Sequence, residues 1–273
     1  MKSDPAYWDS VSQELQRMPP GRLWRRHSDA VDSGLLARWL TEKENGFCLK
    51  TDMYDESLGA GIRLPARAKN WTVVGMDIAL EMLKAARRIG SHRYLVATDI
   101  RRQAFADGVF DAVFSNSTLD HFSSKHQIAV SLGECYRILK PGGRLIITLD
   151  NPLNPILALR QALPYRLLRE LGVTTFYYGC TLTPGALKRA LEGAGFRVLD
   201  MAPVLHCPRV LAIPVARFVE RHAAPGTKRK FLKTLNRFEK LSGLPTRYLT
   251  GHYTAVCCRK EPAACERRVP ESG

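Results

Sequence analysis

The sequence predicts an α/β protein whose core is a mainly parallel sheet. From residue 47 onward, short apolar runs rich in β-branched residues alternate with segments of helical periodicity. Strands that alternate with helices are typical of crossover connections, which place neighbouring strands parallel. The length of 273 residues, of which 45% are hydrophobic, suffices for one or two domains with a core that folds without disulfides.

Five predicted strands and two helices make up the first part of this core. One helix spans 79–88 and is closed by Gly90, and the other ends before the KPGG turn at 140–143. The buried stripe of the second helix consists of Ile128, Leu132, Cys135 and Leu139. Each helix separates two apolar runs. The five runs are FCLK (47–50), WTVVGMD (71–77), YLVATD (94–99), FDAVFSN (110–116) and RLIITLD (144–150).

Two more strands complete the predicted sheet. Thr183 is a suitable N-cap, Pro184 suits the first helical position, and Gly195 is placed to end this third helix. The strand FRVLDM (196–201) follows directly. The last apolar run, HYTAVCC (252–258), has no crossover helix of standard length before it, so we expect it to pair antiparallel at the sheet edge. The sequence therefore predicts seven strands.

The predicted core spans 46–201 plus 252–259, and other segments flank it. We expect residues 1–45 to form an N-terminal helical cap and 202–251 to form a basic helical insertion. Within 207–247, ten basic residues and two acidic ones give a net charge of +8. The tail over 260–273 is rich in Pro, Glu and Arg without periodicity, which predicts disorder.

The charge balance and the cysteines limit the class of protein. Lys and Arg number 41 against 26 Asp and Glu, and the net charge of +15 favours anionic partners such as phosphate groups, nucleic acid or lipid. The seven cysteines are scattered without a C-x-x-C pair, which predicts reduced thiols and no metal site. Because the sequence shows neither a secretory leader nor an apolar stretch of bilayer length, we expect a cytoplasmic protein.

Two carboxylates follow neighbouring predicted strands. Asp77 ends the second apolar run, and Asp99 ends the third. Ligands of open parallel sheets bind outside the carboxyl ends of the strands. There, a carboxylate at 77 can accept both hydroxyls of a ribose, and one at 99 suits an adenine edge. The alternative is that both acids cap helices or lie in loops, but their occurrence together favours a nucleoside site.

Three consecutive motifs carry a resemblance to a known family. They are GMDIALEMLKAA, ATDIRRQAFADGVFDAVFSNSTLDHF and ECYRILKPGGRLIITLDNP. In combination and spacing they resemble motifs of class I S-adenosylmethionine-dependent methyltransferases. The resemblance covers about 47–201 plus the last strand. It implies a Rossmann-like seven-stranded sheet with an antiparallel last strand, and S-adenosylmethionine as cofactor.

The sequence departs from this family after the first strand. Where the family has a glycine-rich G-x-G-x-G loop, this chain reads LKTDMYDE over 49–56. We expect Thr51, Asp52 or Glu56 to replace backbone contacts to the amino-acid end of the cofactor, with 59–61 as a displaced glycine remnant. The resemblance implies cofactor contacts from Lys50, Thr51, Asp52, Asp77, Ile78, Asp99, Ile100 and Asn116.

His121 is the candidate general base. An imidazole suits proton removal from a hydroxyl acceptor, and the adjacent Asp120 would raise its basicity. The alternative is a histidine at a helix start that is satisfied by backbone groups. Methyl transfer from a sulfonium is an in-line displacement that depends mainly on alignment, so the reaction does not by itself require a base.

The resemblance implies a methyltransferase that acts on a small-molecule or lipid-like acceptor. An RNA methyltransferase is an alternative prompted by the charge, but the chain shows no appended RNA-binding module and no aromatic-Pro-Pro signature after the fourth strand. A non-catalytic partner protein is a second alternative, prompted by the missing glycines. The two acids at 77 and 99 favour cofactor binding over this alternative.

The insertion combines apolar residues with clustered cations. Apolar side chains are frequent over 204–219, and the cluster Lys228, Arg229 and Lys230 follows. This combination is compatible with a lid or an interfacial segment that touches anionic lipid at the inner face of the membrane. The alternative is a helix that covers the sheet with a solvated basic face.

Overall fold

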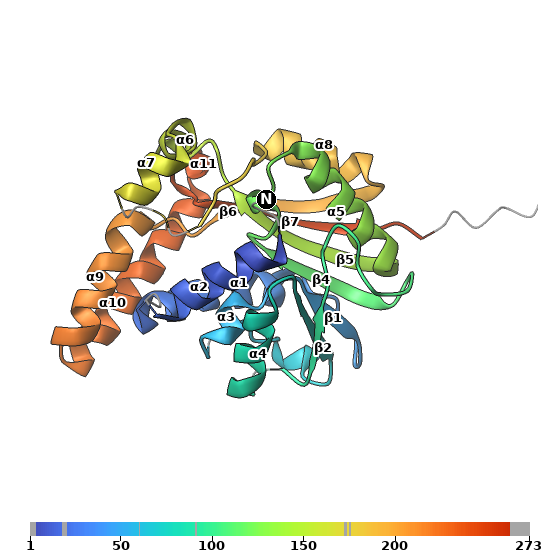
Figure 1. Ribbon diagram of the computed structural model, residues 1–273, viewed down its shortest axis with the longest axis horizontal. Helices are drawn as coiled ribbons and strands as arrows, with labels where there is room; N and C mark the ends of the chain where they lie inside the picture. The colour runs from blue at the N-terminus through green and yellow to red at the C-terminus, as the bar shows by residue number, and fades with distance from the viewer. Residues whose placement is uncertain are drawn as a thin grey trace, which may run out of the picture.

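The computed structural model describes residues 4–17, 21–59, 61–90, 92–171, 174 and 176–262. Its centre is one seven-stranded sheet in the order β3-β2-β1-β4-β5-β7-β6 (Figure 1). The first five strands are parallel, and β7 runs antiparallel to both of its neighbours. The strands are β1 (Phe47–Lys50), β2 (Thr72–Asp77), β3 (Tyr94–Ala97), β4 (Phe110–Asn116), β5 (Leu139–Asp150), β6 (Phe196–Val204) and β7 (Tyr253–Lys260).

The antiparallel direction of the last strand is confirmed, but its predicted place at the sheet edge is wrong. Strand β7 lies between β5 and β6, and β6 forms the edge. Four consecutive residues of β7, over 255–258, are buried. A continuous apolar run of this kind is typical of a strand covered on both faces. The helices of the 202–251 segment bring the chain back to the sheet, where β7 enters between β5 and β6.

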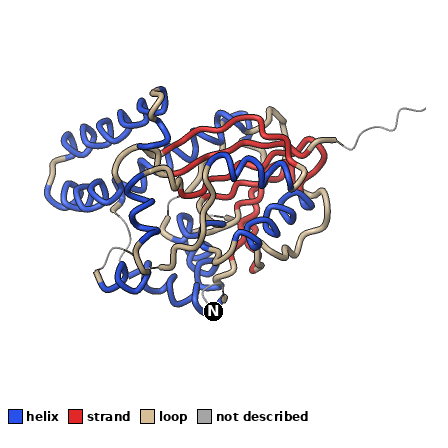
Figure 2. The backbone as a smooth tube through the Cα atoms, turned by 90° about the horizontal axis from the view of Figure 1, so that it is seen from above, coloured by secondary structure: helices blue, strands red, loops and turns tan. Residues whose placement is uncertain are grey.

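Side chains of the central strands alternate between two apolar layers. Leu145 and Ile147 of β5 belong to a layer with helices α5 (Lys125–Ile138) and α8 (Pro184–Gly193), whereas Ile146 packs on the side of α2 (Arg22–Trp39). The period of two in a strand places successive side chains on opposite faces. The sheet is therefore covered on both faces, as Figure 2 shows from above.

Local capping explains where the core helices begin and end. Ser124 accepts a hydrogen bond from the Gln127 backbone at the start of α5, and Thr183 accepts one from Ala186 at the start of α8. Helix α4 (Leu80–Ile89) ends at Gly90, whose φ of 74° lies in the left-handed region. The sequence-based boundaries of α4 and α8 therefore agree with the structure to within about two residues.

The segments outside the sheet form a helical layer beside its carboxyl end (Figure 1). Leu23 and Trp24 of α2 pack with Ala212 and Ala216 of α9, so the N-terminal segment and the insertion share a small core. Strand β6 extends to Val204, past the predicted start of the insertion. The remaining helices are α1 (Pro5–Arg17), α3 (Tyr54–Ser57), α6 (Pro155–Ala162), α7 (Tyr165–Glu170), α9 (Arg209–His222), α10 (Pro225–Phe238) and α11 (Arg247–Thr250), with 3-10 turns at Ala66–Ala68, Leu119–His121 and Glu239–Gly243.

Two further predictions concern the C-terminal tail and membrane-spanning helices. Most of the predicted disordered tail, residues 263–273, lies outside the described residues. Among the residues that are described, no helix combines the length and apolar character that a membrane span requires.

Candidate cofactor and acceptor site

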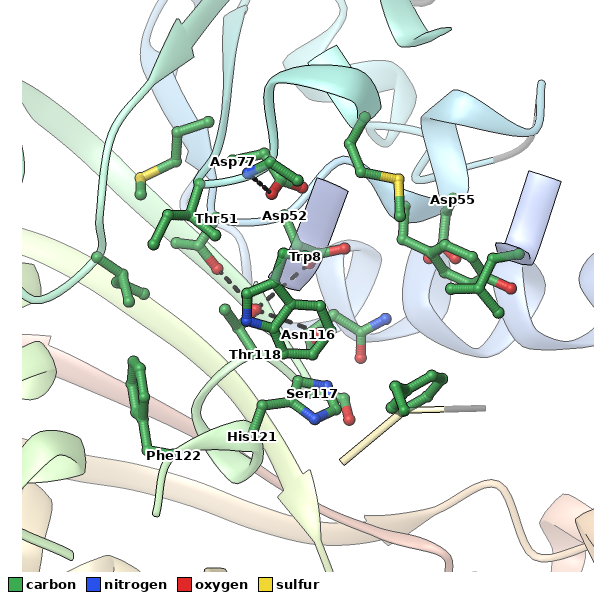
Figure 3. A pocket seen from close by; sticks show the side chains of 18 of the residues that line it. Trp8, Thr51, Asp52, Asp55, Asp77, Asn116, Ser117, Thr118, His121 and Phe122 are labelled. Atoms are coloured by element: carbon green, nitrogen blue, oxygen red, sulfur yellow. Dashed lines mark hydrogen bonds between the residues drawn. The ribbon is translucent and has the colours of Figure 1, made fainter. Parts of the chain in front are cut away.

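One cavity lies at the carboxyl ends of the strands, between the sheet and the N-terminal helices (Figure 3). Its walls come from the loops that follow β1 to β5, from α1 and α2, and from the start of α9 and β7. Eight of the nine residues predicted from the sequence line it. They are Thr51, Asp52, Asp77, Ile78, Asp99, Ile100, Asn116 and His121.

Asp77 ends β2 with both carboxylate oxygens bonded to backbone. One oxygen accepts from the Met53 N–H at 2.9 Å and the other from the Ala79 N–H at 2.8 Å. Burial raises the pKa of Asp77 to about 7, although the two N–H bonds oppose this. Each oxygen keeps a further lone pair for a hydroxyl donor. The carboxylate is thus fixed in direction and open to two donors in the cavity.

Asp99 lies just beyond β3 and is held by Arg101. The guanidinium donates from Nε at 3.0 and 2.9 Å and from Nη2 at 2.5 Å, and the Arg101 backbone N–H donates at 2.8 Å. The same guanidinium lies 5.2 Å from the centre of the Phe122 ring. The buried Ile100 and the half-buried Ile78 add apolar wall on either side. This corner offers a carboxylate edge between apolar surfaces, which suits a purine.

Lys50 does not line the cavity, so the prediction that it contacts the cofactor is not supported. Its side chain is fully buried, and Nζ lies 3.0 Å from Glu56 and 3.2 Å from Asp52. Nζ also donates to the Asp52 backbone oxygen at 2.6 Å. A buried ammonium needs such partners. Lys50 therefore folds the loop after β1 around itself.

The predicted glycine remnant at 59–61 also lies away from the cavity lining. Neither Gly59 nor Gly61 lines it, and residue 60 is outside the described residues. Gly61 has φ 122°, and a Cβ atom there would overlap the Glu56 carboxylate. Gly61 therefore accommodates Glu56, which in turn pairs with Lys50. The loop after β1 thus contains an internal ion-pair network in place of a glycine-rich turn.

Short polar side chains join the ends of β1 and β4. Thr51 Oγ1 lies 3.0 Å from Ser115 Oγ and 3.1 Å from Thr118 Oγ1, and Thr118 donates to Asp52 at 3.4 Å. The Asp52 carboxylate faces the cavity beside these hydroxyls (Figure 3). Burial raises the pKa of Asp52. The ends of β1 and β4 therefore place the negative charge of Asp52 at the cavity without a glycine-rich loop.

Asn116 and Ser117 form the turn after β4. Asn116 Nδ2 donates to Asp32 at 2.9 Å, and its Oδ1 accepts from Thr148 at 2.6 Å. Ser117 has φ 50°, a left-handed conformation that costs energy in a residue with a Cβ. The Ser117 hydroxyl donates to Asp120 at 2.9 Å. The strained turn is held by these bonds, and such turns are frequent at functional sites.

His121 presents one ring nitrogen to the interior of the cavity wall. Its Nδ1 lies 3.2 Å from the Tyr177 backbone oxygen, which assigns the proton of the neutral ring to Nδ1. Its Nε2 lies 3.9 Å from Asp120 Oδ1, a buried oxygen that has no hydrogen-bond partner among the described residues. The Trp8 and Phe176 rings pack at 5.0 and 5.3 Å. His121 can therefore donate from Nδ1 to the backbone and still accept a proton at Nε2.

Several lining residues were not predicted from the sequence. Trp8 and Trp24 come from the N-terminal helices, and Tyr178, Arg209 and Tyr253 come from segments far along the chain. No local pattern places these side chains at the ends of the strands. The clearest sequence signal for Arg209 was its position directly after Pro208, at the start of α9. Within the described parts of the chain, no group of His, Cys, Asp and Glu could hold a metal ion.

The sequence and the structure were compared with known proteins. A family model described as a methyltransferase domain matches residues 57–147. The chain is 38% identical over 108 residues to a demethylmenaquinone methyltransferase of Thermus thermophilus, covering 37% of this chain and 47% of the relative. It is 29% identical over 161 residues to a ubiquinone biosynthesis O-methyltransferase of Xanthomonas axonopodis pv. citri, covering 56% of this chain and 66% of the relative. Residues 57–147 thus resemble a methyltransferase domain, and the chain is similar to S-adenosylmethionine-dependent methyltransferases.

The fold is also similar to that of solved methyltransferase structures. A Thermotoga maritima structure, described as a methyltransferase with possible histamine N-methyltransferase activity, matches with a TM-score of 0.58 at 15% identity, over 93% of this chain and 98% of the other. The chain matches less than two thirds of the length of the two curated methyltransferase relatives. The family model begins at residue 57, directly after the loop in which Lys50 and Glu56 pair.

Proposed function

We propose that this protein transfers the methyl group of S-adenosylmethionine to a small, lipid-like acceptor bound in the same cavity. The observation that carries the proposal is the placement of Asp77 and Asp99. They follow adjacent parallel strands and line one cavity with the turn after β4. Carboxylates at these two places, with apolar surface between them, suit the ribose and the purine of a nucleoside.

Residues at four strand ends would each bind a different part of the cofactor. Asp77 would accept the ribose hydroxyls, and Asp99 would face the adenine amino edge. Asp52 would attract the positively charged amino group of the methionine part. S-adenosylmethionine supplies a methyl group on a positively charged sulfur. The turn at Asn116 and Ser117, which lies beyond Asp52 along the sheet, would face that methyl group.

His121 would take up the proton of a hydroxyl acceptor. Its Nδ1–H is directed to the Tyr177 oxygen, which leaves the Nε2 lone pair to accept a proton. The imidazolium formed would be stabilised by Asp120, whose Oδ1 lies 3.9 Å from Nε2 and accepts no hydrogen bond from the part of the chain that the structure describes. The same contacts hold the ring in one orientation.

The cavity walls support a flat, apolar acceptor. Trp8, Trp24, Phe176, Tyr178 and Tyr253 all line it, and aromatic rings bury large apolar area with little loss of conformational entropy. The two curated relatives named above carry demethylmenaquinone and ubiquinone biosynthesis in their names. An RNA substrate stays the less favoured alternative, because the N-terminal helices contribute the large aromatic side chains Trp8 and Trp24 to the cavity wall.

A transfer assay tests this proposal. The purified chain is incubated with methyl-labelled S-adenosylmethionine and an organic extract of bacterial cells, and label in small organic products is measured. We expect incorporation by the native chain and its loss in Asp77→Ala. Binding of S-adenosylhomocysteine without any incorporation would contradict the enzymatic proposal and favour the non-catalytic partner. Incorporation into RNA alone would favour the RNA alternative.

We also propose that the outer side of α9 and α10 touches an anionic membrane at the inner face. Leu211 and Phe218 of α9 are 67% and 65% exposed. The cluster Lys228, Arg229 and Lys230 lies at the start of α10, which begins three residues after α9 ends (Figure 1). Exposed apolar side chains beside cations suit the interface of an anionic bilayer.

Vesicle sedimentation tests the membrane contact. We expect the chain to bind vesicles with 30% phosphatidylglycerol and not pure phosphatidylcholine, and we expect K228E/R229E/K230E to abolish this binding. The matched control K84E/R87E/R88E makes the same charge change on α4. Equal binding by both triple variants would contradict the proposal. Affinity for S-adenosylhomocysteine should stay unchanged, because surface charges act over about 8 Å at physiological salt.

A further inference from the structure

Arg209 is a cation of the cavity wall without an acidic partner. Two arginines line the cavity, and the other, Arg25, pairs with Asp29 and Asp55 at 2.6 Å each. Among the residues that the structure describes, no carboxylate lies within ion-pair distance of Arg209. Buried charges are normally paired. The geometry points to Arg209 as the binding site for an anionic group, a carboxylate or a phosphate, on the methyl acceptor; this inference rests on the proposed methyl transfer.

The contacts of Arg209 are with neutral groups. Its Nη1 donates to Tyr253 Oη at 2.6 Å and lies 3.3 Å from His252 Nε2. Burial and the nearby Arg209 and Arg160 lower the pKa of His252 well below its usual range, so this ring is neutral. Asp150 lines the same cavity and attracts Arg209 from beyond ion-pair distance, but its carboxylate is bonded to Arg160. The other N–H groups of Arg209 have no partner in the described parts of the chain.

The guanidinium is held in position before any ligand arrives. Arg209 is the first residue of α9, and the turn before it is fixed by Glu239, which accepts from the backbone N–H groups of Leu205 and His206 at 3.0 Å each. The Trp24 and Tyr253 rings lie 5.8 and 6.0 Å from the guanidinium carbon. A planar guanidinium set between rings loses little freedom when it binds a carboxylate or phosphate.

The order of the strands places this cation at the acceptor end. Asp99, Asp77, Asp52 and Asn116 follow β3, β2, β1 and β4, which span three strand intervals, or about 14 Å. Tyr253, which bonds to Arg209, begins β7, two intervals beyond β4. Arg209 therefore lies beyond the turn at Asn116 and Ser117, on the side away from the nucleoside.

The chemistry of the site predicts selectivity among acceptors. A guanidinium with free N–H donors binds planar carboxylates and phosphates in a bidentate manner. The Trp24 and Tyr178 side chains line the same cavity and would cover an apolar ring. We therefore expect an acceptor with an anionic end and an aromatic or aliphatic body. A neutral molecule of the same shape would leave the Arg209 charge unpaired and would bind more weakly.

Calorimetric titration with simple probes tests the inference. The full chain, saturated with S-adenosylhomocysteine, is titrated with benzoate, phenyl phosphate and the neutral benzamide. We expect at least one anion to bind tenfold or more tightly than benzamide, and the two anions distinguish a carboxylate from a phosphate site. Arg209→Met should reduce the preference to less than twofold. Arg221→Met, which removes an exposed charge from the same helix, should keep it.

Three results would overturn the inference. They are the absence of an anion preference in the native chain, its persistence in folded Arg209→Met, and a loss of S-adenosylhomocysteine affinity in that variant without a loss for 5′-methylthioadenosine. The last result would assign Arg209 to the carboxylate of the cofactor. If Arg209→Met does not fold, Arg209→Lys serves instead, with a reduced preference expected because the fork is lost; an unreduced preference there would equally contradict the inference.

The proposed function can fail separately. A chain that binds anions over benzamide but binds no S-adenosylhomocysteine would refute the proposed methyl transfer and, with it, the assignment of the anion to an acceptor. A chain that binds S-adenosylhomocysteine without an anion preference would refute only the role of Arg209.

Discussion

Replacement of Asp77 removes the group that we assign to the ribose. Each carboxylate oxygen accepts one backbone N–H, at 2.9 and 2.8 Å, and offers one further lone pair to the cavity. The charge-assisted bonds to the two ribose hydroxyls should together be worth about 1.5–3 kcal/mol. Because about 1.4 kcal/mol corresponds to a factor of ten, Asp77→Ala should weaken S-adenosylhomocysteine binding by roughly 10- to 150-fold.

The pH dependence of S-adenosylhomocysteine binding provides a second test of the role of the Asp77 carboxylate. Burial raises the pKa of Asp77 to about 7 in the free protein. Ribose hydroxyls donate to the ionised form, so binding should release a proton and weaken as the pH falls below 7. We expect the dissociation constant at pH 6 to be about tenfold higher than at pH 8. Asp77→Asn, which does not ionise, should lose this dependence.

Isothermal titration calorimetry at pH 6, 7 and 8 measures both effects. Thermal unfolding of each ligand-free variant establishes that it is folded, since Asp77 also bonds the Met53 and Ala79 backbone. Asp107→Ala, at a side chain that is 79% exposed, is the matched control. An unchanged dissociation constant in folded Asp77→Ala would refute the assignment of the nucleoside to this strand end.

Three further substitutions separate the parts of the site. Asp52→Ala should weaken S-adenosylhomocysteine binding more than adenosine binding, because we assign Asp52 to the amino-acid part of the cofactor; equal losses in calorimetry would place Asp52 elsewhere. His121→Gln should slow transfer to a hydroxyl acceptor by about 10²- to 10⁴-fold without changing cofactor affinity, and an unchanged rate in the labelled-methyl assay would exclude a base at this position. Trp8→Ala should speed S-adenosylhomocysteine release in stopped-flow measurements, since Trp8 packs 5.0 Å from His121 over the cavity; an unaltered release rate would show that α1 does not retain the cofactor.

The strand ends were predictable from the sequence because the information there is local. Asp77 and Asp99 each follow an apolar run, and parallel strands bring their carboxyl ends to one edge. The position of β7 was not predictable in this way. Its pairing partners depend on the path of the helices over 202–251, and a local pattern predicts the direction of a strand more readily than its neighbours.

The roles of Lys50 and Arg209 show the limit of motif-based prediction. Lys50 ends β1, beside the loop that the resemblance assigns to the cofactor, yet its side chain turns inward to Glu56. Arg209 lies 159 positions along the chain from it, and only the packing of α9 against α2 brings it to the cavity. A single sequence carries no signal for contacts of this kind, because they depend on tertiary packing.

A crystal structure of the S-adenosylhomocysteine complex tests the central claim most directly. We predict the ribose hydroxyls within hydrogen-bond distance of Asp77, the adenine beside Asp99, and the sulfur facing the turn at Asn116 and Ser117. A ligand bound elsewhere, or a nucleoside that contacts neither acid, would contradict the account.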